Sequence, residues 1–347
     1  MTRVAVIGAG ISGVVAASKL QKLGYQVDLF EKSRGRGGRM STRRLGWADV
    51  DTGAQYFTAR SDEFKAEVER WLSTGDISQW EFTPQKAIDG QLVSSPDTET
   101  RYVAMPSMSS LARQYAKDLN LYLNRRIVSA SQKPRSSSKN AQWTINDESG
   151  QEWGPYQWLV SSLPGDQAKQ LFSEHHDIAA RLPRQSHLPC WAVALVTRGE
   201  VDPGIQGVFG GDMVSWVSRL SAKPGRSLPE DGDDLWLLHF QHLWSKSRGK
   251  DCSEQVLQEG VEWMKKHLGP ALTIHHHYIH YWRYAQVSPQ CQLSGPIVWP
   301  EQHIAFIGDW TAGGRVEGAY LSAVQLVEHY FSHNRMREVS TPDKILS

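Results

Sequence analysis

Apolar and polar positions near the start of the chain predict a strand, a helix and a second strand. Residues 3–7 are a run of mainly β-branched apolar residues, which is typical of a buried strand. Residues 11–23 place apolar side chains on one helical face, and Gly24 ends that segment. Residues 26–31 (QVDLFE) form the second predicted strand. This succession has the length of a βαβ unit, so we expect a parallel sheet.

The same periodicities predict further elements along the chain. Helices are expected at 61–72, at 108–119 with Ser107 as N-cap, at 256–268 and at 317–331. Strands are expected at 121–129, 142–146, 156–163, 190–197, 235–240, 274–284 and 303–307. Polar segments rich in turn-forming residues predict loops at 84–100, 133–139 and 223–234 and a polar tail from His333. Helices and strands that alternate in this way indicate an α/β fold.

The composition is that of a globular protein. The 347 residues are 40% hydrophobic and 22% charged, and the length suggests about two domains. The formal net charge of +1 argues against a nucleic-acid partner, which would require a basic excess. The three cysteines (Cys190, Cys252 and Cys291) are far apart, which argues against a disulfide framework. No apolar run is long enough to span a membrane, and we expect a cytoplasmic protein.

The first turn carries a GxGxxG motif between the predicted strand and helix. Gly8 is expected to make the tight turn, Gly10 to let a pyrophosphate approach the backbone, and Gly13 to let helix and strand pack closely. Residues Ile11 and Ser12 then lie at the helix N-terminus, where free N–H groups attract phosphate. The competing interpretation is a glycine-rich turn of an unrelated α/β protein.

Glu31 ends the second strand at the distance expected of a ribose-binding acid. Its carboxylate is placed to accept hydrogen bonds from the ribose hydroxyls and would repel a 2′-phosphate, which excludes NADP at this position. Five arginines interleaved with glycines follow at Arg34, Arg36, Arg39, Arg43 and Arg44. Such a loop suits phosphate groups, but it is equally typical of a solvated basic loop. The motif alone leaves NAD and FAD open.

Several segments together resemble one family. They are EKSRGRGGRMSTRR (31–44), DTGAQYFTAR (51–60), PCWAVAL (189–195), KPGR (223–226), HYWRYAQ (280–286) and IGDWTAGGRVEGAYLSA (307–323). The first and last are similar to motifs found throughout the flavin amine-oxidase superfamily. The middle ones resemble bacterial renalase-like proteins, and the resemblance spans almost the whole chain.

The resemblance implies a Rossmann-type FAD-binding domain (amine-oxidase/p-hydroxybenzoate-hydroxylase-like) with an inserted α+β substrate domain that contains a mixed sheet. The FAD-binding domain would comprise residues 1–60, 101–165 and 296–347, and the substrate domain residues 61–100 and 166–295. FAD would be bound non-covalently, because no cysteine stands between Gly308 and Arg315.

The resemblance also implies which residues contact FAD. They are Gly8, Gly10, Ile11, Ser12, Gly13, Glu31, Lys32, Gly38, Arg39, Met40, Gln55, Tyr56, Gly308, Asp309, Arg315, Val316, Glu317, Gly318 and Ala319. Of these, Arg315–Ala319 would open a helix directed at the isoalloxazine. A helix N-terminus there would stabilise the negative charge of the reduced ring.

Three residues are expected to orient a substrate: Tyr56, Trp282 and Arg283. Gln55 and Tyr56 would lie beside the flavin, although the segment also fits a buried strand end. On an alternating strand, Trp282 faces one side and Arg283 the other. The sequence fits a sheet-packing role for Trp282 nearly as well as a contact with the substrate. The histidines at 275–277 and His280 are split between the faces, so no metal site is expected.

The resemblance implies a reaction in which a hydride passes from a small substrate to FAD and O2 is reduced to H2O2. Renalase-like enzymes suggest isomeric dihydronicotinamide forms of NAD(P)H as the substrate, which need no essential acid or base. Two alternatives stay open on the same fold. One is an amine oxidase or desaturase, and the other is a flavin-binding redox sensor without turnover.

Overall fold

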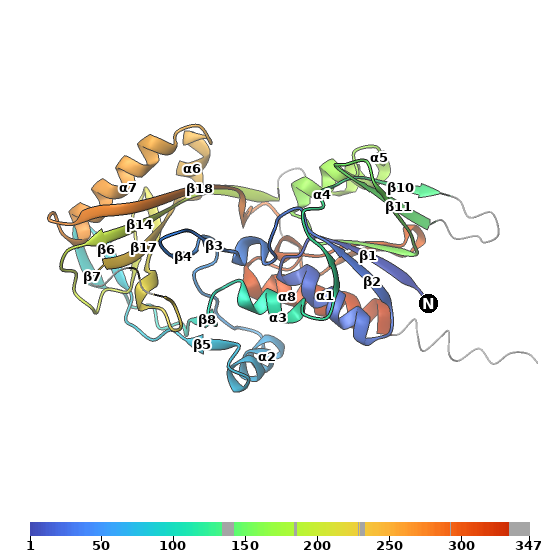
Figure 1. The fold of residues 1–347 in the computed structure, drawn as a ribbon, viewed down its shortest axis with the longest axis horizontal. Helices are drawn as coiled ribbons and strands as arrows, with labels where there is room; N and C mark the ends of the chain where they lie inside the picture. Colours follow the sequence, from blue (N-terminus) through green and yellow to red (C-terminus); the bar gives the residue numbers. More distant parts are fainter. Residues whose placement is uncertain (134–141, 184–185, 228, 230–232, 292, 333–347) are drawn as a thin grey trace, which may run out of the picture. The chain divides into compact units, whose positions relative to one another are not determined.

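The computed structural model describes residues 1–133, 142–183, 186–227, 229, 233–291 and 293–332 (Figure 1). The chain forms two compact units: unit 1 is Met1–Gly38, Ala112–Ser186 and Ser288–Ser347, and unit 2 is Arg39–Leu111 and His187–Val287. Most of the loop predicted at 133–139, part of that at 223–234 and the tail from His333 lie outside the described residues. The assignment of segments to an FAD-binding and a substrate domain concerns ligands and stays a prediction.

Unit 1 is built around a six-stranded sheet. Its order is β19 (Ile297–Trp299), β20 (Ile304–Phe306), β13 (Trp158–Ser161), β1 (Arg3–Ile7), β2 (Gln26–Phe30) and β9 (Asn120–Tyr122). All neighbours are parallel except β19 and β20. The apolar run in β1 is buried, as a strand covered on both faces requires. The carboxyl ends of β1, β2, β13 and β20 therefore meet at one edge.

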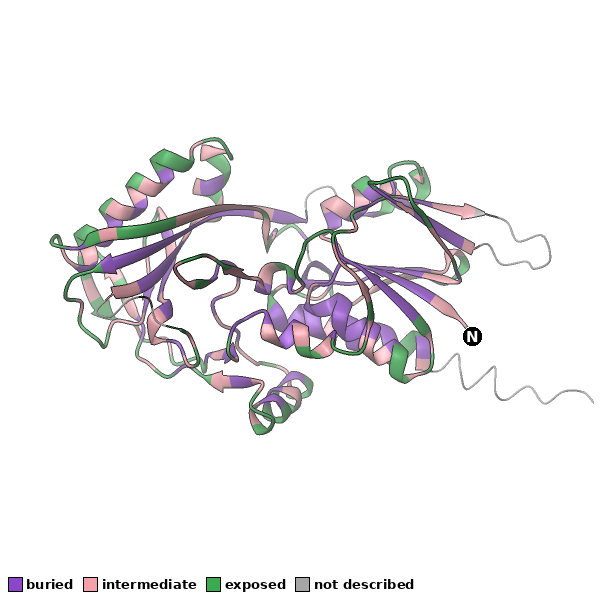
Figure 2. Ribbon diagram, in the orientation of Figure 1, coloured by how far each residue is buried: buried purple, intermediate pink, exposed green. Residues whose placement is uncertain are grey.

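Two long helices of unit 1 lie side by side, α1 (Ile11–Lys22) and α8 (Arg315–Leu326). Both are largely buried (Figure 2). A π-helical segment, Val327–Ser332, continues α8, and its Glu328 pairs with Lys19 of α1. The remaining elements of unit 1 are the antiparallel sheet β10 (Ile127–Lys133), β11 (Gln142–Asp147) and β12 (Glu152–Tyr156) and the short helices α4 (Gly165–Leu171) and α5 (His176–Arg181).

Unit 2 contains a seven-stranded mixed sheet. Its order is β18 (Thr273–Val287), β14 (His187–Arg198), β17 (Asp233–Phe240), β16 (Val214–Arg219), β15 (Gly207–Phe209), β6 (Gln85–Ile88) and β7 (Gln91–Ser94). The other elements are the hairpin β3 (Thr42–Arg44) and β4 (Asp49–Asp51), the pair β5 (Ile77–Gln79) and β8 (Tyr102–Ala104), and the helices α2 (Asp62–Ser73), α6 (His242–Arg248) and α7 (Ser253–Leu268).

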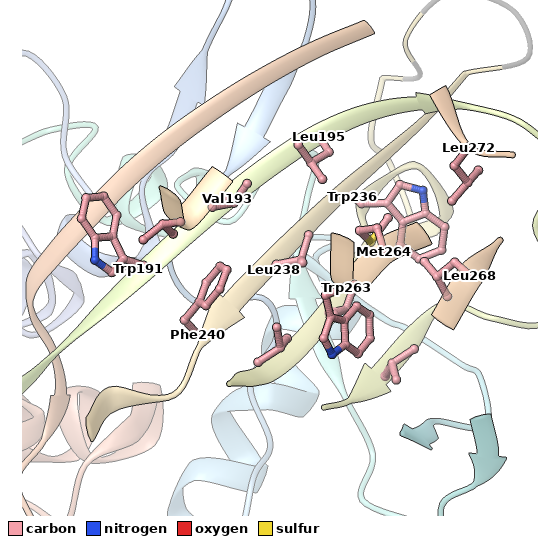
Figure 3. Close-up of a cluster of buried hydrophobic side chains, with 14 residues drawn as sticks. Trp191, Val193, Leu195, Trp236, Leu238, Phe240, Trp263, Met264, Leu268 and Leu272 are labelled. Atoms are coloured by element: carbon pink, nitrogen blue, oxygen red, sulfur yellow. The ribbon is translucent and has the colours of Figure 1, made fainter. Parts of the chain in front are cut away.

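Strand alternation gives the unit 2 sheet two different faces. On β17, Trp236, Leu238 and Phe240 point to a cluster that includes Trp263 and Met264 of α7 (Figure 3). The intervening Leu235 and Leu237 belong to a second cluster with small residues of β14 and partly buried residues of the β3–β4 hairpin. Large side chains thus fill the helix-covered face, and small ones admit the hairpin on the other.

Several sequence predictions differ from the structure. The helix expected at 108–119 is only Ser110–Tyr115 (α3), because the N–H groups of Met108 and Ser109 bond to side chains of Asp51 and Thr42 instead. At its other end, the N–H groups of Lys117 and Leu119 reach back only three residues and close turns.

The strand expected at 121–129 divides into β9 and β10 around Asn124, whose φ is +53°. The segment 84–100 was predicted as a loop, but it contains the hairpin β6–β7. The prediction missed the hairpin because its polar residues show no clear alternation of polar and apolar positions. Among the described residues, no helix has both the length and the apolar character that crossing a membrane requires.

Candidate functional site

The glycines of the GxGxxG turn are required by close contacts in unit 1. Gly8 has a φ of +101°, and a Cβ on Gly13 would stand 2.0 Å from the Gly8 carbonyl oxygen. A Cβ on Gly10, by contrast, would meet no described atom within 4 Å. Gly8 and Gly13 are therefore needed for folding of the turn, whereas Gly10 leaves an open surface that a ligand can approach.

The N-terminus of α1 presents backbone donors at this surface. Its N-cap is Gly10, which has no side chain to accept from the first N–H groups, and Ile11 and Ser12 follow it. The helix dipole adds partial positive charge at the same end. A bare glycine turn with free donors and positive potential fits a pyrophosphate.

Glu31 is held just beyond the end of β2. Its Oε2 accepts from the Ala9 N–H at 2.9 Å, and its Oε1 accepts from the Ser33 N–H at 2.9 Å. Each carboxylate oxygen has a second lone pair, so both remain able to accept from a ribose hydroxyl. The adjoining Lys32 is exposed.

The arginine–glycine loop returns to the first turn. The Gly37 N–H donates to the Ala9 carbonyl at 2.8 Å, and Gly10 and Gly37 form an isolated parallel bridge. Gly38 has a φ of +53°, and its Cβ would lie 3.3 Å from the Gly10 Cα. The backbone of this loop thus lies against the surface at Gly10.

The C-terminal motif reaches the same sheet edge, since Gly308 closely follows β20. The Gly308 N–H donates to the Ser322 hydroxyl of α8 at 3.0 Å, and Asp309 beside it is buried. Gly314 and Arg315 have positive φ values of 83° and 66° and lead into α8, which has no side-chain N-cap. This is a second helix N-terminus without a side-chain cap at the carboxyl edge of the sheet.

The first turn of α8 is closely packed. A Cβ on Gly318 would stand 2.1 Å from the Ala312 carbonyl oxygen, so only glycine fits. Val316, Glu317 and Ala319 around it are buried. The expected residues of unit 1 therefore gather at one sheet edge, and the open space at Gly10, the two helix N-termini and Glu31 together fit FAD.

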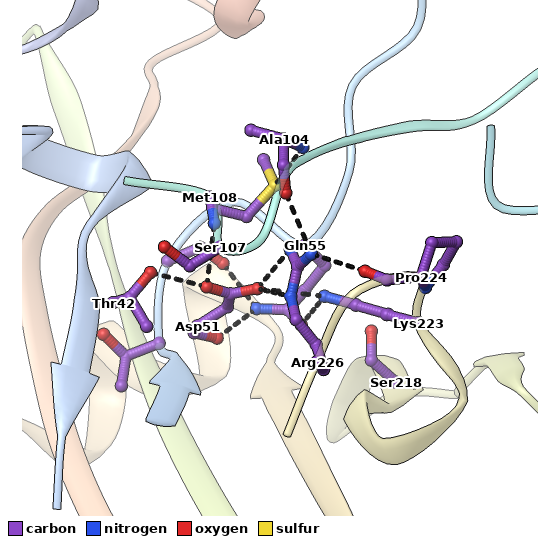
Figure 4. A network of polar contacts seen from close by, with 12 residues as sticks. Thr42, Asp51, Gln55, Ala104, Ser107, Met108, Ser218, Lys223, Pro224 and Arg226 are labelled. Carbon is purple, nitrogen blue, oxygen red and sulfur yellow. Dashed lines mark hydrogen bonds and ion pairs between the residues drawn. The ribbon is translucent and has the colours of Figure 1, made fainter. Parts of the chain in front are cut away.

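In unit 2, the predicted ligand-binding residues Gln55 and Tyr56 lie in the segment Asp51–Tyr56. Contacts of the Asp51 side chain hold the first residue of this segment in place (Figure 4). The Asp51 side chain is buried. Its Oδ2 accepts from Arg226 Nε at 2.9 Å and Nη2 at 2.7 Å, and its Oδ1 accepts from the Thr42 hydroxyl and the Met108 N–H. Burial alone would raise the pKa of Asp51, but Arg226, Lys223 and these hydrogen bonds lower it below its ordinary value.

Lys223 fixes the other end of the segment. Its ammonium donates to Gln55 Oε1 at 2.8 Å, and the Gln55 amide donates to the carbonyls of Asp51 and Gly53 at 2.6 and 2.8 Å. Lys223 is completely buried, and this burial lowers its pKa to about 7 despite the nearby Asp51.

The middle of the segment is held through one carbonyl. The Thr52 oxygen accepts from Trp282 Nε1 at 2.9 Å and lies 3.1 Å from His239 Nε2. Burial lowers the pKa of His239 to about 4, so its ring is neutral at pH 7 and donates through Nε2–H. A Cβ on Gly53 would lie 1.9 Å from the carbonyl oxygen of Arg39, which also accepts from the Ala54 N–H at 2.8 Å.

Tyr56 packs against a second buried cation. The Arg101 guanidinium lies 5.1 Å from the centroid of its ring and forms an ion pair with Asp97 at 2.7 Å. Burial raises the pKa of Tyr56, and Arg101 opposes that rise. The Tyr56 ring also meets the edge of Trp216 with centroids 5.3 Å apart. Tyr56 is thus a neutral, oriented phenol.

The remaining expected residues of unit 2 divide into two groups. Trp282 packs in the cluster beneath the β3–β4 hairpin, whereas Arg283 is exposed on the opposite side of β18. Arg39 donates to the Ala285 carbonyl of β18, and Met40 is buried beside it in the chain. Gln55, Tyr56, Trp282 and Arg39 therefore meet at the Asp51–Tyr56 segment, and Arg283 does not join them. Their roles toward ligands stay predictions.

Sequence reasoning missed Asp51, Lys223, Arg226 and His239 as parts of this site. Lys223 and Arg226 belong to the KPGR motif, which the resemblance had singled out, but no local pattern shows that a lysine in a polar segment is buried. Among the described residues, no three His, Cys, Asp or Glu side chains gather as metal ligands would.

Comparisons with known proteins agree with this architecture. The family model described as flavin containing amine oxidoreductase matches residues 90–328, and one described as an NAD(P)-binding Rossmann-like domain matches residues 6–71.

Among curated proteins, the 1-hydroxycarotenoid 3,4-desaturase of Flavobacterium sp. (strain P99-3) is 43% identical over 58 residues, 17% of this chain and 12% of that protein. The flavin-dependent L-tryptophan oxidase RebO of Lentzea aerocolonigenes is 46% identical over 44 residues, 13% of this chain and 9% of that protein. These matches therefore cover only a small part of either relative.

Solved structures match almost the whole chain. Reduced UDP-galactopyranose mutase has a TM-score of 0.72 at 13% identity, with 99% of this chain and 95% of that chain covered. Putrescine oxidase bound to putrescine has a TM-score of 0.65 at 12% identity, with 98% and 99% covered. An oxidoreductase from Methanosarcina mazei has a TM-score of 0.67 at 12% identity, with 94% and 100% covered. At these identities the likeness shows the fold alone.

Proposed function

Because the chain belongs to the family of flavin-containing amine oxidoreductases, it is an FAD-dependent oxidoreductase, and we propose that its substrate is an isomeric dihydronicotinamide form of NAD(P)H. The chemistry that bound FAD supplies is acceptance of a hydride from the substrate and reduction of O2 to H2O2. The dihydronicotinamide would leave as NAD(P)+.

The role of the protein's own residues is to bind FAD and to orient the substrate beside it. The bare turn at Gly10 and the N-terminus of α1 would hold the pyrophosphate, and Glu31 would accept from the adenosine ribose. The uncapped N-terminus of α8 would stabilise negative charge on the ring system. Gln55 and Tyr56 would lie along the ring and the substrate.

One observation carries the choice of substrate class. Three of the four middle segments that resemble renalase-like proteins meet at one place, since Lys223 and Arg226 of KPGR and Trp282 of HYWRYAQ all bind the Asp51–Tyr56 segment. We infer from this convergence that the three segments serve one shared local function.

Asp51 and His239 at this segment are weak bases near neutral pH, which suits a substrate that needs no deprotonation. Asp51 is occupied by Arg226 and His239 is neutral. A dihydronicotinamide gives up a hydride directly, whereas a protonated amine must first lose a proton. Orientation by packed rings is then sufficient for the reaction.

A product balance tests the proposal. Purified protein in air is given 2-, 4- or 6-dihydroNAD(P), and NAD(P)+ and H2O2 are measured. We expect one H2O2 for each NAD(P)+ with the 2- or 6-dihydro form, and a far slower reaction with amines such as putrescine. Turnover of amines alone would reject the substrate class and favour the amine-oxidase alternative, to which the names of several relatives point. Absence of turnover with every donor would favour the redox sensor.

A further inference from the structure

Lys223 is a completely buried cation whose position needs an explanation. Its Nζ lies 2.8 Å from Gln55 Oε1, 3.9 Å from Asp51 Oδ2 and 5.2 Å from the centroid of the Trp80 ring. Burial of an ammonium group carries a large desolvation cost unless it is paired. Its neighbour Asp51 is already engaged at short distance by Arg226. Lys223 is therefore not needed to neutralise Asp51.

The buried charges around Lys223 do not balance. Asp51 supplies one negative charge, whereas Lys223 and Arg226 supply two positive charges. The charge of Lys223 also helps to lower the pKa of His239. His239 is neutral at pH 7, so it adds no charge to this group. Together with burial, this arrangement favours loss of a proton from Lys223 near neutral pH.

The ammonium group adds a charge-assisted bond to a Gln55 amide that two carbonyls already orient. Both donors of the Gln55 amide are used, one on the Asp51 carbonyl and one on the Gly53 carbonyl. Its oxygen faces Lys223. A reversed amide would set NH2 against the ammonium and its oxygen against two carbonyls, so all its contacts would become repulsive. A neutral amine could still donate to the Gln55 oxygen, but without the charge that strengthens the bond.

We propose that Lys223 is a positioning residue, whose protonated form holds Gln55, and with it the Asp51–Tyr56 segment, in the arrangement that supports the reaction. The proposal rests on the proposed function in one respect, because it assumes that this segment contacts the flavin or the substrate. It follows that the rate of flavin reduction is highest when Lys223 is charged and falls as the pH rises.

The direction and size of this pH dependence follow from the pKa of Lys223, which is lowered to about 7. Below pH 6 Lys223 is charged, and at pH 9 only about one molecule in a hundred keeps the proton. If only the charged form is competent, the rate constant of reduction falls about tenfold for each pH unit above about 8. Lys223→Arg keeps the charge and should be flat over this range, whereas Lys223→Met should be slow throughout. Lys65→Met, at an exposed lysine of the same unit, should behave as wild type.

A direct titration tests the proposal without any turnover. In FAD-loaded protein labelled with ¹⁵N-lysine and ¹⁵N-glutamine, NMR follows Lys223 Nζ and the Gln55 side-chain amide, with assignments from Lys223→Arg and Gln55→Glu. We expect both signals to shift with one midpoint near pH 7. A Lys223 midpoint near the ordinary 10.5, or a Gln55 amide that ignores the transition, overturns the proposal. If no donor reduces the flavin, the proposed function fails, yet this titration still decides the role of Lys223.

Discussion

Replacement of Asp51 by asparagine should destabilise unit 2 more than its size suggests. Asp51→Asn keeps one acceptor and turns the other into a donor that faces either Arg226 or the Met108 N–H. Arg226 would then be a buried cation without an anionic partner, because its other contacts are the carbonyls of Ala104 and Pro224. Removal of one partner of a buried ion pair costs about 3–5 kcal/mol.

Urea unfolding followed by tryptophan fluorescence measures this cost. With an m value of about 2 kcal/mol/M, the midpoint of the unit 2 transition should fall by about 2 M. The control is Glu99→Gln, which removes a half-exposed ion pair with Arg60 and should cost no more than about 1 kcal/mol because solvent screens it. Equal costs for the two variants would refute the reasoning that Asp51 holds the segment together.

The pH dependence provides a second check on Asp51. Its pKa in the folded protein is lowered, so its stabilising contribution is fully present above the ordinary pKa of 3.8. The contribution disappears as the pH falls through the lower folded value. The difference between wild type and Asp51→Asn should therefore shrink as the pH falls below 3.8. A difference that keeps growing below pH 3.8 would contradict this assignment.

Two further predictions concern the two units separately. Gly13→Ala places a Cβ against the Gly8 carbonyl and should cost about 1–3 kcal/mol with loss of bound flavin, whereas Gly35→Ala, whose Cβ meets no described atom within 4 Å, should change neither the melting temperature nor the flavin absorbance per protein. Trp282→Phe removes the donor to the Thr52 carbonyl and should cost about 0.5–1.5 kcal/mol and slow flavin reduction. Trp191→Phe removes a similar bond to the Gly249 carbonyl and should cost as much without slowing reduction, so equal slowing in both would contradict the role of Trp282.

The β1–α1–β2 unit could be predicted from the sequence because its signals are local. The apolar run of β1, the glycine spacing and Glu31 all lie within one short segment. Gly8 and Gly13 meet the close contacts that their positions imply, and the space at Gly10 is open. The alternation of β18 was equally readable, with Trp282 on the hairpin side and Arg283 exposed.

The rest depends on contacts between distant segments. The hairpin β6–β7 is polar and is recognisable only because β6 pairs with β15. Helix α3 is shorter than its apolar periodicity suggests because side chains from β3 and β4 take its first N–H groups. Lys223 stands in a segment whose composition indicates solvent exposure, and it is buried only because Gln55 and Asp51 come from another part of the chain.

Anaerobic stopped-flow mixing tests the proposed substrate class most directly. The flavin absorbance near 450 nm is followed after mixing with 2-, 4- or 6-dihydroNAD(P) or with a panel of amines at equal concentration. The account predicts rapid single-turnover bleaching by the 2- or 6-dihydro form, with NAD(P)+ formed in equal amount, and little bleaching by amines. Rapid bleaching by amines, with none by any dihydronicotinamide, would contradict it.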